Sequence, residues 1–211
     1  MKIGILGSGL MGGKLGTLWA KSGHDITFSF ARSEQKLSRL AEEAGARYGS
    51  VADAVKDADA VLLAVHWSKV GDVLDQAGDL AGTVVLNCCI PLNDTDSELV
   101  LGLTTSGAEE LEKMRPDARW VGCFSTTPSE SFFPVFDRKG QPTPPHVMAY
   151  GDDDDAKDVA FSLIRDVGFE PQDTGGLRNA RYIEPFAMAT VELAYVQPGP
   201  ASWTYRFEKL R

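Results

Sequence analysis

The N-terminal segment reads Lys2-Ile-Gly-Ile-Leu-Gly-Ser-Gly-Leu-Met-Gly12, an apolar run that leads directly into a complete G-x-G-x-x-G motif. The run has the composition of a buried β-strand, and the residues after it follow a helical pattern. In this strand-to-helix position the motif is typical of a dinucleotide site. Gly7 permits the tight turn, Gly9 lets the backbone approach a pyrophosphate, and Gly12 lets helix and strand pack closely. The start of the helix then presents free N–H groups to the phosphates.

Short apolar runs alternate with helical patterns through the first 126 of the 211 residues. The expected strands are residues 2–6, 25–30, 60–65, 83–88 and 119–124. Most of them are apolar at consecutive positions, as strands covered on both faces are. Between them, apolar residues recur at helical spacing, for example at Met11, Leu15, Leu18 and Trp19. This alternation predicts an α/β fold with a doubly wound, mostly parallel Rossmann sheet.

The pattern of residues in the sequence changes after Thr126. Residues 128–145 contain five prolines and little periodicity, which predicts a long loop, and we interpret it as a lid over a second substrate. A strand at 146–151, a helix, a short strand at 169–173 and a last helix follow. We therefore predict a dinucleotide-binding Rossmann domain at 1–126 and a small α/β C-terminal portion at 127–211 for substrate binding and dimerisation.

The end of the second strand indicates which dinucleotide binds. An NAD enzyme places Asp or Glu there to bind the ribose hydroxyls. Residues 28–33 read Phe-Ser-Phe-Ala-Arg-Ser, with no carboxylate before Glu34. Arg32 can hold a 2′-phosphate by charge-assisted hydrogen bonds, which favours NADP(H); the alternative is a solvated surface arginine. Further donors are expected from Ser29, Ser33 and Lys36.

The rest of the predicted cofactor site lies at the carboxyl ends of the strands, where ligands of doubly wound sheets bind. We expect His66 to hydrogen-bond cofactor or backbone, and Cys88 and Cys89 to be small packing residues. The complete set is Gly7, Ser8, Gly9, Leu10, Met11, Gly12, Ser29, Phe30, Arg32, Ser33, Lys36, Ala64, Val65, His66, Trp67, Asn87, Cys88 and Cys89.

Composition argues against several classes of partner. The formal charge is −9 with no basic cluster, which disfavours nucleic acid and anionic membranes. The longest apolar run, 60–65, is far shorter than a membrane span, and the N-terminus is interpreted as a mature strand. Three cysteines fit no zinc motif, so we expect no metal site and buried thiols in the cytoplasm. Residues 152–155, all Asp, resemble a metal site, but complementing a helix dipole is the favoured interpretation.

Several stretches together resemble the family of coenzyme F420-dependent NADP reductases. Besides residues 3–12 and 29–32, they are Val121-Gly-Cys-Phe-Ser-Thr126, Gly151-Asp-Asp-Asp154 and Asp173-Thr-Gly-Gly-Leu-Arg-Asn-Ala-Arg-Tyr-Ile-Glu-Pro185. The resemblance implies a Rossmann domain with a small C-terminal domain, a homodimer, and hydride transfer between the nicotinamide and the deazaflavin. Aromatic residues that would suit either the dimer interface or the core are Tyr182, Phe186, Tyr195, Trp203 and Tyr205.

Hydride transfer between two cofactors needs no acid or base from the protein. The side chains have only to stack the hydride donor and the hydride acceptor about 3–3.5 Å apart. We therefore predict no catalytic side chain. The predicted second-substrate residues are Ile90, Pro91, Ser125, Thr126 and Pro128, beside Cys89. The resemblance implies coenzyme F420 as the second substrate. Because family members that use the deazaflavin tend to have His where this chain has Ser125, a flavin is the alternative.

The same sequence features also fit other functions. A flavin, quinone or small-carbonyl reductase would use the same cleft, and a sensor would bind NADP(H) without oxidising it. The β-hydroxyacid dehydrogenase and imine reductase group is disfavoured, because those enzymes need a long helical domain and only residues 127–211 follow Thr126.

Overall fold

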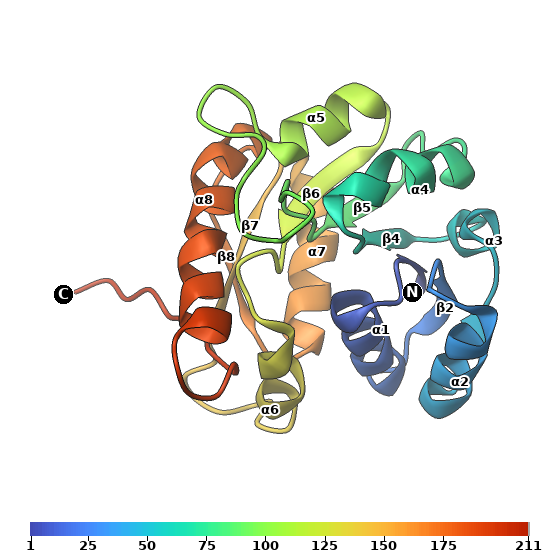
Figure 1. Cartoon of the computed structure of the whole chain (residues 1–211). Coiled ribbons are helices and arrows are strands. Elements are labelled where there is room, and N and C mark those ends of the chain that lie inside the picture. Colours follow the sequence, from blue (N-terminus) through green and yellow to red (C-terminus); the bar gives the residue numbers. More distant parts are fainter. Residues whose placement is uncertain (211) are drawn as a thin grey trace.

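Eight strands form one sheet, in the order β3-β2-β1-β4-β5-β6-β7-β8, in the computed structural model, which describes residues 1–210 (Figure 1). The pairs are parallel except β6 with β7, which confirms the predicted mostly parallel sheet. The strands are β1 Lys2–Leu6, β2 Asp25–Ser29, β3 Arg47–Tyr48, β4 Ala60–Leu63, β5 Val84–Asn87, β6 Arg119–Cys123, β7 His146–Tyr150 and β8 Glu170–Asp173.

Helices cover both faces of the sheet, as the sequence predicts. On one face α1, α2, α6 and α7 pack around Trp19 and Phe28, and on the other α3, α4, α5 and α8 pack around Val61 and Val85. Strands buried on both faces need apolar residues at every position, and each residue of β4 is fully buried. The helices are α1 Leu10–Lys21, α2 Glu34–Ala44, α3 Val51–Val55, α4 Val70–Ala77, α5 Gly107–Met114, α6 Phe132–Phe136, α7 Asp154–Asp166 and α8 Ala180–Val191, with short turns η1 Trp67–Lys69, η2 Ser129–Ser131, η3 Leu177–Asn179 and η4 Glu192–Val196.

The order of the strands places a crevice beside β1. The chain runs outward from β1 through β2 to β3, then crosses to the other side of β1 and continues through β4, β5 and β6. At such a switch point the connections leave the sheet in opposite directions, which opens a crevice outside the carboxyl ends of the strands. The glycine turn that follows β1 opens into this crevice.

The proline-rich segment differs from the predicted loop. Residues 129–136 form η2 and α6, and Phe132 is fully buried against Phe124 and Phe169, with ring centroids 5.7 and 6.2 Å apart in edge-to-face geometry. Two aromatic contacts of this kind anchor the segment in the core. The prediction of a continuous loop is therefore wrong for residues 129–136, and the lid over a second substrate stays a prediction.

The C-terminal portion extends the same sheet. Gly122 of β6 pairs with Tyr150 of β7, and β8 follows at the edge. The tail after α8 returns to the start of β7, where the His146 N–H donates to the Tyr205 carbonyl at 2.9 Å. Among residues 1–210, no helix combines the length and apolar character needed to cross a membrane.

Candidate functional site

The glycine turn has the geometry that its sequence predicts. Gly7 has φ +113°, in the region that favours glycine, and a Cβ on Gly12 would overlap the Gly7 carbonyl oxygen. Gly9 is different, because no described atom lies within 4 Å of the position that its Cβ would take. The turn is therefore tightly packed at Gly7 and Gly12 and open at Gly9, where the prediction places a pyrophosphate.

The start of α1 is available to an anion. Its N-cap is Gly9, no side chain among residues 1–210 caps it, and its first turn contains no acidic residue. By contrast, Ser33, Ser50 and Ser106 cap α2, α3 and α5 through their side chains. The uncapped N–H groups and the positive end of the helix dipole suit a phosphate.

A cleft of about 820 Å³ lies in front of this turn. Most of the predicted cofactor residues that follow β1, β2 and β4 meet there. The lining comprises Gly7, Ser8, Gly9, Leu10, Phe30, Ala31, Arg32, Lys36, Ala64, Val65, His66, Ser68, Lys69 and Asp94. Ala31, Ser68 and Lys69 lie close in sequence to predicted cofactor residues, so that proximity could have indicated them. Asp94 lies in a loop that no sequence pattern identifies as part of the site.

Three cations line the cleft: Arg32, Lys36 and Lys69. In the described part of the chain none of the three forms an ion pair, and the one lining carboxylate, Asp94, forms none either. Their charges are therefore available to a ligand. In a chain of net charge −9, this is a local cationic site of the kind that a phosphorylated nucleotide requires.

Other predicted cofactor residues support the cleft without lining it. Ser29 is fully buried, and its hydroxyl donates to the Ile5 carbonyl at 2.8 Å. Contrary to the prediction, this hydroxyl therefore does not face the cleft. Ser33 caps α2 by accepting from the Lys36 N–H at 3.3 Å. Residues that pack in or against the core are Met11, Gly12, Trp67, Asn87, Cys88 and Cys89. Burial raises the pKa of Cys89 to about 12, which suits a packing residue rather than a nucleophile.

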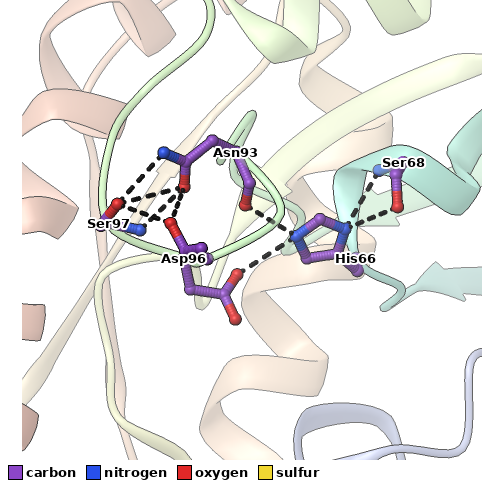
Figure 2. Close-up of polar contacts among 6 residues, drawn as sticks. His66, Ser68, Asn93, Asp96 and Ser97 are labelled. Atoms are coloured by element: carbon purple, nitrogen blue, oxygen red, sulfur yellow. Dashed lines mark hydrogen bonds and ion pairs between the residues drawn. The ribbon is translucent and has the colours of Figure 1, made fainter.

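His66 ties the end of β4 to the loop that carries Asp94 (Figure 2). Its Nδ1 accepts from the Ser68 N–H at 3.2 Å, which places the ring proton on Nε2. Nε2 lies 3.2 Å from both the Asn93 carbonyl and an Asp96 carboxylate oxygen. The Asn93 side chain in turn accepts from the Ser97 N–H at 3.0 Å. The expected backbone hydrogen bond of His66 is therefore present, and it positions one wall of the cleft.

The predicted second-substrate residues lie at the next strand ends, after β5 and β6. Ile90 is half-buried and the others are buried. Thr126 Oγ1 lies 2.6 Å from the hydroxyl of Tyr205, which comes from the C-terminal tail. These residues do not line the 820 Å³ cleft. Their common position is the carboxyl edge of the sheet, beyond the nucleotide end: Ile90, Pro91, Ser125, Thr126 and Pro128.

A buried polar cluster behind these residues escaped the sequence analysis. Glu184 of α8 is 1% exposed and accepts from the N–H groups of Gly107 and Ala108 at 2.8 and 3.0 Å. Burial raises its pKa from 4.5 to about 7. Nearby, the buried Tyr150 hydroxyl makes no hydrogen bond of regular geometry among residues 1–210, although Ser125 lies beside it, and its ring fills the space left by the absent side chain of Gly122.

The described residues contain no group of three or more His, Cys, Asp or Glu side chains that could hold a metal ion. The four aspartates at 152–155 serve other contacts. Asp153 caps α7 and binds Arg119 with oxygen–nitrogen distances of 2.6 and 2.7 Å, and Asp154 pairs with Lys157 at 2.9 Å. The dipole interpretation of this run agrees with Asp153 at the N-cap.

Fold and cleft together define a Rossmann-type α/β protein. Residues 2–91 match the family described as NADP oxidoreductase, coenzyme F420-dependent, which confirms the resemblance seen in the sequence over this part of the chain. The family that residues 2–91 match is thus a family of NADP oxidoreductases.

Individual relatives are more distant. The metalloreductase STEAP3 of Rattus norvegicus is 28% identical over 186 residues, which are 87% of this chain but 36% of that protein, so the chain spans about a third of this relative. A structure from an Arthrobacter species, provisionally described as an F420-dependent NADP reductase, superposes with a TM-score of 0.86 at 24% identity, covering 99% of this chain and all of the other. The pyrroline-5-carboxylate reductase of Coxiella burnetii gives a TM-score of 0.65 at 21% identity over 92% of this chain and 66% of the other.

Proposed function

We propose that the protein is an NADP(H)-dependent oxidoreductase that transfers hydride between the nicotinamide and a second substrate at the carboxyl edge of the sheet. One observation carries the proposal: the uncapped start of α1, the open space at Gly9 and three unpaired cations face one cleft. A phosphate group accounts for all three features. Its oxygens accept hydrogen bonds from the free N–H groups of α1, its negative charge suits the cations, and the space at Gly9 leaves room for it. The description of the family matched by residues 2–91 supports the same cofactor.

The side chains of the cleft fit NADP(H) in particular. Arg32 and Lys36 lie beyond the end of β2, where a 2′-phosphate would bind, and the start of α1 would hold the pyrophosphate. His66 would keep the adjoining loop in place, and Asp94 on that loop is free to accept hydrogen bonds from a ribose. NADPH supplies the hydride when bound, so the chain's own task is to bind, orient and exclude water.

Replacing Arg32 tests the choice of dinucleotide. Arg32→Glu is expected to weaken NADPH binding on the order of 100-fold and to change NADH binding little, because it exchanges a phosphate partner for a repelling charge. Titration with both nucleotides, followed by their fluorescence, measures the two affinities. Arg39→Glu is the matched control, since Arg39 is also exposed, on the following helix and outside the cleft. Equal losses for NADPH and NADH would remove Arg32 from the 2′-phosphate site.

For the second substrate we propose the deazaflavin coenzyme F420. The family description supports it, as does the position of Ile90, Pro91, Ser125, Thr126 and Pro128 beside the nucleotide end of the sheet edge. A flavin, quinone or small-carbonyl acceptor, and a sensor without turnover, are the competing functions. We also propose a cytoplasmic location, which agrees with three buried free cysteines.

An anaerobic mixture of protein, NADPH and oxidised F420 tests this function directly. Loss of the deazaflavin absorbance at a rate proportional to protein concentration is the expected result. Tight NADPH binding without loss of that absorbance would contradict F420 as acceptor. Flavins, quinones and small carbonyls would then be supplied in its place, and no oxidation of NADPH by any of them would leave the sensor.

A homodimer is part of the proposal. Large apolar side chains are exposed on α8, on η4 and along the tail, and an exposed apolar area of this kind suits an interface. They are Tyr182, Phe186, Leu193, Tyr195, Val196, Trp203 and Phe207. Sedimentation velocity is expected to give twice the mass of one chain, and a monomer at micromolar concentration would contradict it.

A further inference from the structure

The carboxyl edge of the sheet continues beyond the proposed acceptor residues. Because β7 runs antiparallel to β6 and β8 runs parallel to β7, the starts of β7 and β8 lie at the edge where β1, β4, β5 and β6 end. Along this edge the nucleotide cleft comes first, at β2, β1 and β4. Ser125 and Thr126 follow at β6, and a third position lies at the starts of β7 and β8.

A second cavity, of about 420 Å³, occupies that third position. It lies between residues 131–145, the turn before β8 and the tail at 202–206. Arg138 and Arg206 line it together with hydroxyl groups such as Thr143 and Thr204, and none of its described lining residues carries a carboxylate. In a chain with 30 acidic and 21 basic residues, the described residues that line this cavity carry positive charge alone, with Glu208 pairing Arg206 from outside the lining. A local positive charge of this kind favours an anionic ligand.

The two arginines differ in how they are held. Arg206 donates to the Pro144 carbonyl at 2.8 Å and lies 3.3 Å from a Glu208 oxygen, so its position is fixed by the protein. Arg138 makes no side-chain hydrogen bond or ion pair within residues 1–210. Its guanidinium therefore has all its donors available, in a planar arrangement that suits phosphate and carboxylate.

Tyr205 connects this cavity with the acceptor position. Tyr205 lines the cavity, while its hydroxyl lies 2.6 Å from Thr126 Oγ1 and accepts from the Met148 N–H at 3.1 Å. One tyrosine side chain thus separates the cationic cavity from Thr126. A tail that runs from the acceptor residues to the two arginines would have to pass Tyr205.

We infer that this cavity binds an anionic tail, phosphate or carboxylate, of the second substrate. The inference rests on the proposed function and narrows its substrate class to acceptors that carry a charged tail. A neutral quinone or a small carbonyl compound has no group to place between Arg138 and Arg206. Charge-assisted hydrogen bonds from arginine are the interactions that such a tail would gain.

Two pairs of probes test the inference, each with one ring system and a tail present or absent. FMN and riboflavin share the isoalloxazine ring and differ by the terminal phosphate. F420 and its tailless ribityl deazaflavin differ by the phosphate and carboxylates together. Binding is measured by quenching of probe fluorescence, and turnover by anaerobic oxidation of NADPH. We expect the tailed member of at least one pair to bind about tenfold more tightly.

Arg138→Ala is expected to remove most of this tenfold preference, and it is the main variant because Arg138 supports no described contact. Arg206→Ala should act alike, with its melting temperature checked because Arg206 also holds Pro144. Arg178→Ala, which removes an exposed arginine outside the cavity, is the charge-matched control and should keep the preference.

The outcomes separate the two proposals. Oxidation of NADPH with equal affinity for tailed and tailless probes, or a preference that survives Arg138→Ala, overturns the tail site and leaves the oxidoreductase standing. A preference that only FMN shows indicates a phosphate, and one that only F420 shows indicates its longer tail; both support the site. No oxidation of NADPH with any probe overturns the proposed function, and absence of tail-dependent binding in the same titrations overturns the tail site.

Discussion

Gly9→Val should abolish dinucleotide binding and leave the folded protein intact. The backbone of Gly9 has φ −80°, which any residue adopts, and its missing side chain points into space that no described atom occupies. A valine there fills the place where the pyrophosphate approaches the start of α1, so NADPH affinity is expected to fall on the order of 100-fold or more. NADH affinity should fall as far, because both nucleotides carry the pyrophosphate. Fluorescence titration measures the affinities and thermal unfolding measures the fold.

Two other glycines provide the comparison. Gly71→Val, at an exposed position of α4, also places its side chain in open space and should change neither binding nor stability. Gly12→Ala should instead lower the melting temperature, since its Cβ would overlap the Gly7 carbonyl oxygen. Unchanged NADPH affinity in Gly9→Val would mean that the glycine turn does not seat the cofactor.

Glu184→Gln should change how the stability of the protein depends on pH. The pKa of Glu184 is raised from 4.5 to about 7, so the folded state holds its proton more tightly than the unfolded chain does. Between these values the folded state binds more protons, and the contribution of Glu184 to stability therefore falls as the pH rises. The fall amounts to at most about 3 kcal/mol. Glutamine does not titrate, so the variant loses this dependence.

Urea denaturation at several pH values from about 5 to 8 measures the effect. The unfolding free energy of the wild type minus that of Glu184→Gln is expected to decrease with rising pH. Glu112→Gln, on the exposed face of α5, is the control and should show a constant difference. A constant difference for Glu184→Gln as well would mean that the two N–H donors of α5 hold Glu184 ionised at every pH tested.

The sequence predicts the nucleotide half of the fold because local patterns and tertiary structure agree there. A strand such as β4 is buried on both faces and apolar throughout, so its composition alone identifies it. The antiparallel direction of β7 has no such signal, because His146–Tyr150 is a buried strand like the others. Helix α5 was missed for a related reason: Gly107–Met114 contains few apolar residues, and Ser106, Glu109 and the carboxylate of Glu184 define it instead.

The residues of the candidate site likewise divide into those that the sequence predicts and those that it does not. Gly7 and Gly12 could be predicted because a tight turn leaves glycine as the single residue that fits, and Gly9 because a pyrophosphate would need the space that a side chain would fill. Asp94 could not, because folding alone brings it to the cleft. Ser29 shows the converse error, since its place in the chain suits the cofactor but its hydroxyl is turned to the Ile5 carbonyl.

The pairing of Gly122 with Tyr150 has a kinetic consequence. It joins the nucleotide half to the C-terminal portion by backbone hydrogen bonds, and the Trp19 indole N–H of α1 donates to the Leu163 carbonyl of α7 at 2.9 Å across the same core. The hydride donor and the hydride acceptor would thus both be bound by one rigid sheet. The distance between them would be set when the chain folds. Turnover would require no bending between two lobes, and product escape would be governed by the surface segments around the cleft.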